Sequence, residues 1–461
     1  MLPNLTDAAA PDAVPLLPIT ADRLDAWIAG QPEPVGAWIR ATGFKADAGA
    51  TALLPDAGGR LGRILVGLGR GDDPWAFGGL PSTLPAGAYR IEGAMDPAAA
   101  TAAALAWALG GYAFTRYRSS ERRGATLAWP ETCDRAAVER AASATTLVRD
   151  LVNTPANDMG PAELAQAARD LAAEFGASFE EIVGDELLAR GYPTIHAVGR
   201  ASTRPPRLVD FSWGHEGDPA VVLVGKGVCF DSGGLDIKPS AGMLLMKKDM
   251  GGAAHVLGIA RMVMMAGLRV RLRVLIPAVE NAISGDAFRP LDVIRTRKGT
   301  TVEIGNTDAE GRLILCDALH EAASRKPDLI VDFATLTGAA RVALGPDLPA
   351  LFCNDDGTAQ RLADAGREVA DPLWRLPLHR PYRKMLDSKV ADLSNTGSSP
   401  FAGAITAALF LESFIPEGIR WAHFDTFAWN PSSRPGRPEG GEALGMRAVF
   451  RLLERDYSNA R

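Results

Sequence analysis

Acidic and basic side chains that could bind and use metal ions are concentrated in two short stretches of this chain. The charged residues of 224–249 and 306–313 include four carboxylates and three cations that could form one site: Asp231, Asp249, Asp308 and Glu310, and Lys226, Lys238 and Arg312. Four carboxylates gathered in one pocket repel one another strongly unless positive charge neutralises them. Two divalent ions would supply that charge, and paired metals suit the hydrolysis of an unreactive bond. We therefore expect a metal-dependent hydrolase, provided that these residues converge.

Each residue of the first stretch also has an ordinary structural interpretation. Lys226 could be an exposed loop lysine, and Asp231, which precedes Ser-Gly-Gly, could be a turn-forming aspartate. Asp249 precedes a predicted helix and could interact with the helix dipole. These interpretations do not explain why four acids and two lysines cluster around two predicted strand ends. That clustering favours a site.

The second stretch places its charged residues at alternate positions. If residues 306–313 are extended, the side chains of Asp308, Glu310 and Arg312 point to the same side. The stretch follows a predicted strand at residues 300–304 and precedes a helix, and a strand end that opens onto a loop is where α/β sheets bind ligands. Taken alone, D-A-E-G-R could equally be a solvated turn.

The donor types limit the choice of metal and of chemistry. A set of carboxylates without His or Cys favours Mg²⁺, Mn²⁺ or Zn²⁺. A lysine binds metal only as the neutral amine, so the metal must keep its proton off. The six histidines show no H-x-x-x-H or H-E-x-x-H spacing. Ser232 has no G-x-S-x-G motif, and the phosphate-binding G-x-x-x-x-G-K-[ST] is absent, so serine-nucleophile and nucleotide chemistry are disfavoured.

Strands and helices alternate in the part of the chain that carries these residues. The pattern predicts a strand at residues 220–225 with few polar residues, as expected for a strand buried on both faces. Alternating β and α units predict a mostly parallel central sheet flanked by helices. The further predicted strands are 270–279, 329–333 and 421–427, and the predicted helices are 161–175, 251–265 and 314–324.

The first part of the chain carries none of the clustered carboxylates and reads as a smaller, mixed α/β domain. At 461 residues the chain is too long for one ordinary core. An Ala-rich segment without Pro or Gly precedes the turn formers N-T-P-A-N-D, which predicts a bridging helix. We predict three regions: an N-terminal domain at 1–135, a linking helix and turn at 136–155, and a catalytic domain at 156–461.

Composition excludes several other classes of protein. The formal net charge of −6 gives no overall attraction to nucleic acid or anionic membranes. No secretory signal is visible, and the uncharged segment 97–115 is mostly Ala, Gly and Thr, which predicts a buried helix rather than a membrane span. Four scattered cysteines favour reduced thiols in a cytoplasmic protein, although their spacing leaves a disulfide between distant positions open.

Three motifs resemble the leucine aminopeptidase (cytosol aminopeptidase) family of dinuclear metallopeptidases. They are V-G-K-G-V-C-F-D-S-G-G-L-D-I-K-P-S at 224–240, M-K-K-D-M-G-G-A-A at 246–254 and N-T-D-A-E-G-R-L-I-L-C-D-A-L at 306–319. The resemblance runs in order over roughly residues 150–430, and it includes L-V-N-T-P-A-N, D-F-A-T-L-T-G-A and W-A-H-F-D. The N-terminal part resembles the family only in size and position.

The resemblance implies a role for each residue of the site. Asp231 and Glu310 would bridge two metals, Lys226 and Asp249 would complete one metal site, and Asp308 the other. Lys238 would act as the electrophile on the scissile carbonyl, and Arg312 would hold a bicarbonate that acts as general base. Four further residues would line the substrate groove or its specificity pocket: Met246, Thr335, Leu336 and Gly338.

The same resemblance implies the activity and the assembly. It implies an enzyme that removes the first residue from peptides with a free N-terminus, with leucine-type or broad specificity, using two zinc or manganese ions, with magnesium as the third choice. It also implies a homohexamer, whereas the composition and net charge predict a cytoplasmic protein without a membrane or nucleic-acid partner. Residues 430–447 depart from the family pattern: the stretch has E-A-L-G-M-R where T-G-R-P is usual. That region borders the specificity pocket in relatives, so the first-residue preference stays open.

Two alternatives remain at this point. A non-catalytic family member with a scaffold or regulatory role would be expected to lose metal ligands or Lys238, and this chain keeps them all. A different dinuclear hydrolase, such as a phosphatase, would usually recruit histidines, and the motifs contain none.

Overall fold

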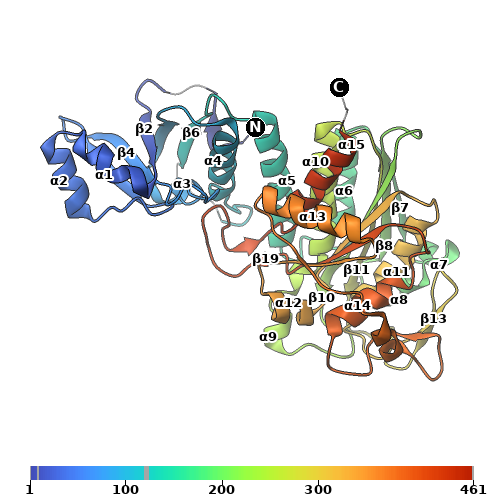
Figure 1. The fold of residues 1–461 in the computed structure, drawn as a ribbon. Helices are drawn as coiled ribbons and strands as arrows, with labels where there is room; N and C mark the ends of the chain where they lie inside the picture. Colours follow the sequence, from blue (N-terminus) through green and yellow to red (C-terminus); the bar gives the residue numbers. More distant parts are fainter. Residues whose placement is uncertain (1, 8–9, 119–123, 459–461) are drawn as a thin grey trace. The chain divides into compact units, whose positions relative to one another are not determined.

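The computed structural model describes residues 2–7, 10–118 and 124–458, and these form two compact units. The first unit comprises Met1–Thr146 with Asn430–Glu439, and the second comprises Leu147–Trp429 with Gly440–Arg461. Helix α5 (Arg135–Asn153) runs across the point where the first unit ends. Figure 1 follows the elements along the chain. A smaller α/β unit and a larger unit with a helix-flanked sheet confirm the predicted fold class.

The first unit is built on a six-stranded sheet with the order β1-β6-β5-β2-β4-β3. Its pairs are parallel except β3 with β4. The uncharged segment forms helix α4, which begins after Asp96, whose carboxylate accepts hydrogen bonds from two backbone amides at 3.0 Å. Trp107 of α4 is fully buried in this unit's core. The elements are β1 (Leu5–Thr6), β2 (Val14–Ile19), α1 (Ala21–Ala29), α2 (Glu33–Thr42), β3 (Thr51–Pro55), β4 (Leu61–Gly67), α3 (Leu80–Thr83), β5 (Gly87–Ile91), α4 (Pro97–Gly110) and β6 (Ala125–Ala128).

The second unit contains a nine-stranded sheet, and its central strands are parallel. The order is β16-β15-β18-β14-β9-β11-β8-β7, and β10 pairs with β11 beyond this path. Strands β11, β9, β14 and β18 are parallel neighbours, whereas β8 and β15 run antiparallel at either side. The strands are β7 (Ser178–Val183), β8 (Arg207–Trp213), β9 (Ala220–Gly225), β10 (Gly227–Asp231), β11 (Arg271–Asn281), β14 (Leu329–Ala334), β15 (Ala350–Cys353), β16 (Trp374–Arg375) and β18 (Trp421–Asp425).

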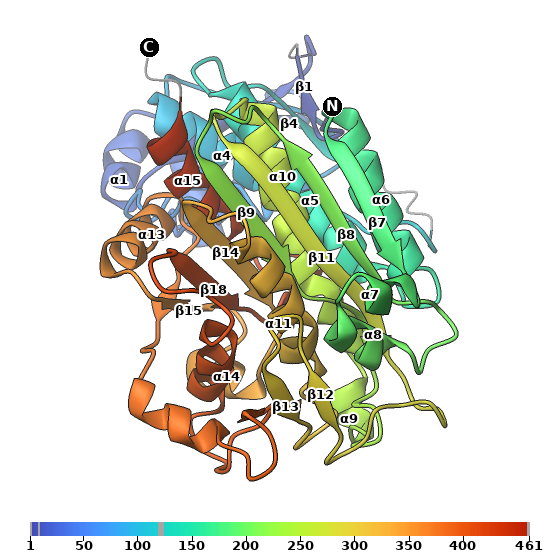
Figure 2. The same cartoon turned by 90° about the vertical axis from the view of Figure 1, so that its right-hand side faces the viewer.

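Helices cover both faces of this sheet, and Figure 2 shows α8 and α11 in front of it and α6 and α10 behind. The helices are α6 (Pro161–Glu174), α7 (Glu186–Ala189), α8 (Pro193–Gly199), α9 (Ser240–Met243), α10 (Gly251–Ala266), α11 (Glu310–Ala323), α12 (Gly338–Leu344), α13 (Asp356–Glu368), α14 (Gly403–Glu412) and α15 (Met446–Tyr457), with 3₁₀ segments η1 (Met246–Met250) and η2 (Arg380–Leu386). Short strands complete the chain: β12 (Val293–Arg295), β13 (Thr301–Glu303), β17 (Leu393–Ser394), β19 (Trp429–Asn430) and β20 (Gly440–Gly441).

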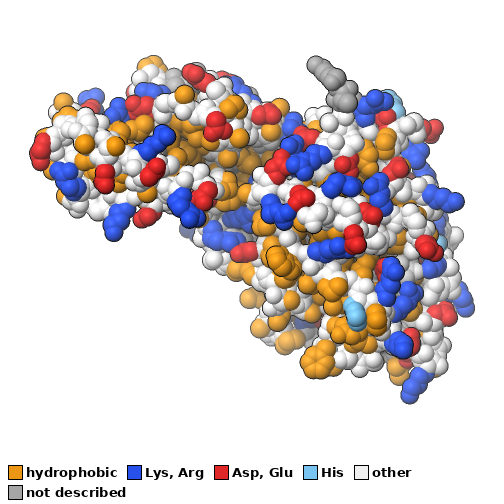
Figure 3. All heavy atoms as spheres, viewed as in Figure 1, with side chains coloured by type: hydrophobic (Ala, Val, Ile, Leu, Met, Phe, Trp, Pro, Cys, Tyr) orange, Lys and Arg blue, Asp and Glu red, His pale blue; other side chains and the backbone are white. Residues whose placement is uncertain are grey.

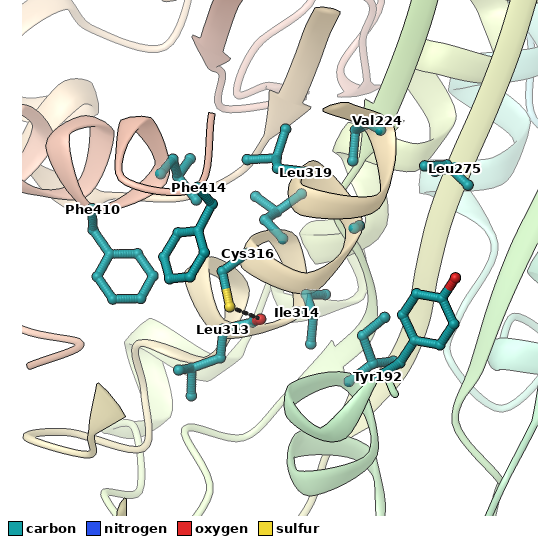
Figure 4. Close-up of a cluster of buried hydrophobic side chains, with 14 of the residues drawn as sticks. Tyr192, Val224, Leu275, Leu313, Ile314, Cys316, Leu319, Phe410 and Phe414 are labelled. Carbon is teal, nitrogen blue, oxygen red and sulfur yellow. Dashed lines mark hydrogen bonds between the residues drawn. The ribbon is translucent and has the colours of Figure 1, made fainter. Parts of the chain in front are cut away.

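Helix α11 is fixed in an apolar core of the second unit (Figure 4). Leu313, Ile314 and Leu319 of this helix are fully buried, and Phe414 packs in the same cluster. The thiol of Cys316 donates a hydrogen bond to the Leu313 carbonyl at 3.0 Å, so its donor is paired within the helix. Because the helix is held along its length, the charged residues in its first turn have a fixed position.

The sequence predicts reduced thiols at the cysteines and a buried helix, rather than a membrane span, at the uncharged segment 97–115. All four cysteines are free, and three of them are buried, as expected for reduced thiols. Among the described residues, none of the helices combines the length and the apolar character that a bilayer crossing requires.

Candidate metal centre

The candidate site lies where the parallel strands of the second unit end. Strand β9 ends at Gly225 and is followed by Lys226, β10 ends at Asp231, and β14 is followed by Thr335. Parallel strands bring their carboxyl ends to one edge of the sheet, and the crevice at that edge is where α/β sheets bind ligands. The strand order therefore brings together residues that are about a hundred positions apart in the chain.

The loop after β10 is held to the second motif by a two-way clamp. Thr307 donates its backbone amide to Asp236 Oδ2 at 2.7 Å and its hydroxyl to the Gly233 carbonyl at 2.6 Å. Gly233 and Gly234 have φ angles of 89° and 67°, a region that favours glycine. A Cβ on Gly233 would lie 2.4 Å from the Asp236 carbonyl oxygen, so this turn needs glycine. The clamp fixes Asp231 relative to Asp308.

The expectation that residues 306–313 are extended is wrong. Helix α11 begins at Glu310, because the apolar residues from Leu313 onward continue the helix back toward the motif. Side chains two positions apart on a helix point in directions that differ by about 200°, so the side chain of Arg312 leaves the helix on a different side from that of Glu310. Asp308 and Glu310 nevertheless meet: oxygens of these two residues and of Asp231 lie within 4.8 Å of one another.

Two lysines connect the four carboxylates. Lys226 Nζ lies 2.8 Å from Asp249 Oδ2 and 2.8 Å from Glu310 Oε1. Lys238 Nζ lies 2.8 Å from Asp231 Oδ2 and 2.5 Å from Asp308 Oδ1. The structure therefore brings together all four predicted acids and both predicted lysines.

The electrostatics show that the cluster lacks positive charge. Burial, and then the charge of Asp231, raise the pKa of Glu310 to about 8. The same two causes raise the pKa of Asp308 to about 6. Burial alone would lower the pKa of Lys226, but the carboxylates of Asp249 and Glu310 outweigh it and raise that pKa. Raised pKa values of the acids, beside a lysine whose pKa is also raised, indicate an excess of negative charge.

The donor set fits divalent metal ions. Four carboxylates and two ammonium groups leave two negative charges when all are ionised. Asp231, Glu310 and Asp249 are each at most 2 % exposed, and ionised carboxylates buried to this degree need cations or hydrogen bonds. Oxygen ligands suit hard or borderline ions, and the Lys226 amine could join them after losing its proton. The residues that could hold the metals are Lys226, Asp231, Asp249, Asp308 and Glu310.

Three polar residues orient the acids and the neighbouring backbone, and sequence reasoning missed two of them, Asn281 and Asp425. Asn281 Nδ2 donates to Asp231 Oδ1 at 2.9 Å, and the Thr335 hydroxyl, expected only in the groove wall, donates to Asp249 Oδ1 at 2.6 Å. Asp425 Oδ1 accepts the Leu336 amide at 2.9 Å. Asn281 and Asp425 are the last residues of β11 and β18. Their position at carboxyl ends of parallel strands was a signal that could have found them.

A cavity of about 370 Å³ opens beside the cluster, and its wall contains all four of the predicted groove residues: Met246, Thr335, Leu336 and Gly338. Helices α9 and α12 contribute to the wall. Hydrophobic side chains gather over the region of these two helices in Figure 3, and Leu244 and Val342 there are 79 % and 84 % exposed. No histidine of the described residues lines the cavity.

Arg312 is placed differently from the other predicted residues, because it does not line the cavity. Its side chain is 8 % exposed, and Nη1 donates to the Asn395 carbonyl at 2.7 Å. Its Nε is buried without a hydrogen-bond partner among the described residues. Burial lowers the pKa of this guanidinium to about 10. An unsatisfied buried donor of this kind fits a small anion such as bicarbonate.

Comparison with protein families gives two matches along this chain. Residues 146–450 match the model for the cytosol aminopeptidase family, catalytic domain. Residues 14–130 match the model for the M17 aminopeptidase, N-terminal domain. The second match extends the similarity into the region where the sequence motifs had shown none.

Individual proteins are similar over most of the chain. A probable cytosol aminopeptidase of Geobacter sp. (strain M21) is 43% identical over 375 residues, which cover 78% of this chain and 76% of that protein. The crystal structure of cytosol aminopeptidase from Coxiella burnetii has a TM-score of 0.95 and 52% identity, covering 98% of this chain and 99% of that one. The bottromycin maturation enzyme BotP in complex with Mn has a TM-score of 0.86 and 38% identity, covering 96% and 99%.

Proposed function

This chain belongs to the cytosol aminopeptidase family and is a hydrolase that acts as an aminopeptidase, and from this premise we propose the residues and the mechanism by which it cleaves peptides. The observation that carries the proposal is the convergence of Asp231, Asp308 and Glu310 within 4.8 Å. The ammonium of Lys226 lies 2.8 Å from both Glu310 and Asp249, and so links Asp249 to this group. Asp231 and Glu310 would be shared by two divalent ions, Lys226 and Asp249 would complete one site, and Asp308 would complete the other.

When bound, the two metals supply polarisation of the scissile carbonyl and a lowered pKa for the attacking water. The carboxylates hold them at the carboxyl edge of the sheet, next to the groove. Zinc or manganese is favoured over magnesium, because one ligand is an amine nitrogen. The neighbour BotP was solved with manganese.

Lys238 is the residue that stabilises the negative charge that develops on the scissile carbonyl oxygen in the transition state. Its side chain lines the cavity beside Asp231 and Asp308. Burial alone would lower its pKa, but Asp231 and Asp308 outweigh this and raise it, so the amine stays protonated at neutral pH. A fixed ammonium aimed at the carbonyl oxygen contributes ~3 kcal/mol to the transition state, like other preorganised donors.

Arg312 would hold a bicarbonate, which would supply the general base for the attacking water. The support is the unpaired, buried Nε of Arg312 and the position of this residue in the first turn of α11, where the helix dipole also favours an anion. The guanidinium itself carries no proton transfer, because it keeps its charge near neutral pH.

The groove wall positions the peptide. Thr335, Leu336 and Gly338 lie between the end of β14 and the start of α12, and Asp425 accepts hydrogen bonds from the amides of Leu336 and Thr337 at 2.9 and 3.2 Å. Met246 adds an apolar surface for the first side chain. This wall supports leucine-type or broad specificity. The family resemblance further supports a cytoplasmic homohexamer, which light scattering of the purified protein would test.

The test uses one pair of substrates and one variant. Protein loaded with Mn²⁺ or Zn²⁺ should hydrolyse leucyl-p-nitroanilide and should leave N-acetyl-leucyl-p-nitroanilide intact, because the free amine anchors the substrate. Lys238→Ala should lower kcat by about 100-fold while retaining both metals, as expected for loss of ~3 kcal/mol. Equal cleavage of the two substrates would refute the proposed amine anchoring. A non-catalytic role is disfavoured because every ligand and Lys238 are present in one cavity.

A further inference from the structure

Two cations that the proposed mechanism does not use contact one aromatic ring in the wall of the catalytic cavity. Lys248 Nζ lies 4.7 Å from the centroid of the Phe427 ring, and Arg341 Cζ lies 5.0 Å from the same centroid. All three residues line the cavity of about 370 Å³ that also contains Met246. The metal centre and these cations therefore share one cavity.

Neither cation forms an ion pair within the described part of the chain, in contrast to the two site lysines. Lys226 and Lys238 each contact two carboxylates. Lys248 is only 5 % exposed, and a buried ammonium without an anionic partner is unfavourable. Its cation–π contact offsets only part of this cost.

The two carboxylates whose charge acts on Lys248, Asp249 and Asp425, are already engaged with other groups. Asp249 accepts from the Thr335 hydroxyl at 2.6 Å and pairs with Lys226 at 2.8 Å. Asp425 accepts the Thr337 hydroxyl at 2.6 Å as well as the two backbone amides described above. These acids act on Lys248 at longer range but leave its ammonium without direct contact. An anionic group that entered the cavity would give the Lys248 ammonium the direct anionic contact that these acids do not provide.

The cavity also offers apolar surface on the way to the two cations. Met246 lies two residues before Lys248, and Leu245 and Leu348 line the same wall. A side chain with one or two methylene groups and a terminal carboxylate would contact this surface with its carbons and the cations with its oxygens. Arg341 can bind such a carboxylate in a bidentate manner, and Lys248 adds a point charge.

We propose that Lys248 and Arg341 form a recognition site for the side-chain carboxylate of the first residue, so that peptides beginning with Glu or Asp are preferred substrates. This proposal rests on the aminopeptidase function proposed above and replaces a simple leucine preference. The two cations come from η1 and α12, which also carry Asp249 and Gly338, so they are fixed beside the metal ligand and the groove wall.

The test compares substrates that differ in charge but not in shape. Glutamyl- and glutaminyl-p-nitroanilide are matched in this way, and the wild type should favour the glutamyl substrate by at least about 10-fold in kcat/KM. Arg341→Met and Lys248→Met should each bring this ratio toward one, mainly through a higher KM for the glutamyl substrate, while leucyl-p-nitroanilide is still cleaved.

Controls separate charge recognition from damage to the metal centre. Lys248 adjoins Asp249, so the metal content of Lys248→Met is measured, whereas Arg341 contacts no proposed ligand. Lys389 is exposed and does not line the cavity, and Lys389→Met should leave the ratio unchanged. Arg341→Glu should reverse the preference and favour lysyl over glutamyl substrates, as expected for a site that reads charge.

The possible outcomes distinguish the two proposals. A glutamyl-to-glutaminyl ratio near one in a wild type that cleaves leucyl substrate overturns the acidic-residue site and leaves the aminopeptidase function intact. An effect of Arg341→Met only on dipeptides with a free C-terminal carboxylate, compared with their amides, would assign the cations to the leaving residue and also overturn it. Cleavage of none of the amides by metal-loaded protein would overturn both.

Discussion

Lys226 Nζ lies 2.8 Å from Asp249 Oδ2, and both side chains are only 3 % exposed. The same ammonium contacts Glu310 and donates to the Thr335 carbonyl at 2.9 Å. Lys226 therefore lies among three oxygen atoms and partly neutralises the two carboxylates. A metal that binds there must remove the lysine proton and use the nitrogen as a ligand.

Metal binding is therefore expected to release a proton from Lys226. The carboxylates raise the pKa of this amine, so it is protonated at pH 9, above the pKa of about 8 of Glu310. Titration calorimetry in buffers of different ionisation enthalpy at pH 9 should show that Lys226→Met releases about one proton fewer than the wild type and binds one metal more weakly. Equal proton release by both proteins would show that Lys226 is not a ligand.

Gly311 gives a second test, because it leaves room for the Lys226 side chain. A Cβ at Gly311 would lie 2.7 Å from Lys226 Nζ and 2.7 Å from its Cε. Within a helix, Gly→Ala normally stabilises by ~1 kcal/mol. Gly311→Ala is instead expected to displace Lys226 and to lower kcat/KM at least about 10-fold, together with affinity for one metal.

Gly357 in α13 provides the matched control for this substitution. A Cβ there would meet nothing closer than 3.5 Å. Gly357→Ala should keep full activity and raise the melting temperature slightly. Full activity and two bound metals in Gly311→Ala would contradict the assigned contact.

Asp425 is expected to act by positioning the groove wall. Its carboxylate accepts from the backbone amides of Leu336 and Thr337 and from the Thr337 hydroxyl. An amide offers fewer acceptor sites, so Asp425→Asn should loosen this loop and lower kcat/KM about 10-fold with both metals retained. Steady-state kinetics with leucyl-p-nitroanilide and metal analysis would measure this.

A second buried aspartate distinguishes positioning from general destabilisation. Asp332 is fully buried and holds Trp421 and His423 with hydrogen bonds of 2.6 Å, but it does not line the cavity. Asp332→Asn should lower the melting temperature and leave the KM unchanged. Identical kinetic effects of the two variants would show that Asp425 acts only through stability.

His255 predicts how stability depends on pH. Its ring is fully buried, with Nδ1 2.6 Å from the Gly251 carbonyl and Nε2 accepting the Leu444 amide at 2.9 Å. This arrangement requires the neutral ring, and burial lowers its pKa. Below about pH 6.5, His255 binds a proton in the unfolded chain but not in the folded chain. The contribution of His255 to the free energy of unfolding is therefore lost as the pH falls.

The loss should approach about 1.4 kcal/mol per pH unit between pH 6.5 and the folded pKa. Urea unfolding at pH 7.0 and 5.5 should show the wild type losing stability relative to His255→Gln, whereas the exposed control His215→Gln should follow the wild type. Parallel pH dependence of wild type and His255→Gln would contradict a neutral, buried His255.

The sequence predicted the strands that carry the site because they are continuous apolar runs with turn formers at their ends. β9 and β14 lie at the predicted positions within one residue, Lys226 follows β9, and Asp249 precedes helix α10 as expected. Asp231 instead ends β10, a strand that the sequence pattern did not predict. The extended conformation considered for the second motif was wrong. A polar sequence gives no sign that the helix fixed by the buried Leu313 begins as early as Glu310.

Other features depend on contacts between segments far apart in the chain. The ring of Phe427 lies beside Lys248 and Arg341 only after β18 has been placed next to β14. The clamp between Asp236 and Thr307 likewise joins two loops that local patterns treat separately. Periodicity and turn chemistry describe single elements, so they could not predict these contacts.

The most direct test of the central claim is anomalous X-ray diffraction from crystals of the purified protein equilibrated with Mn²⁺. Two strong anomalous peaks per chain are expected, both in contact with Asp231 and Glu310, one also touching Lys226 and Asp249 and the other Asp308. A crystal in which the ions bind elsewhere, or in which the four carboxylates hold no ion while their lysine pairs remain intact, would contradict the account.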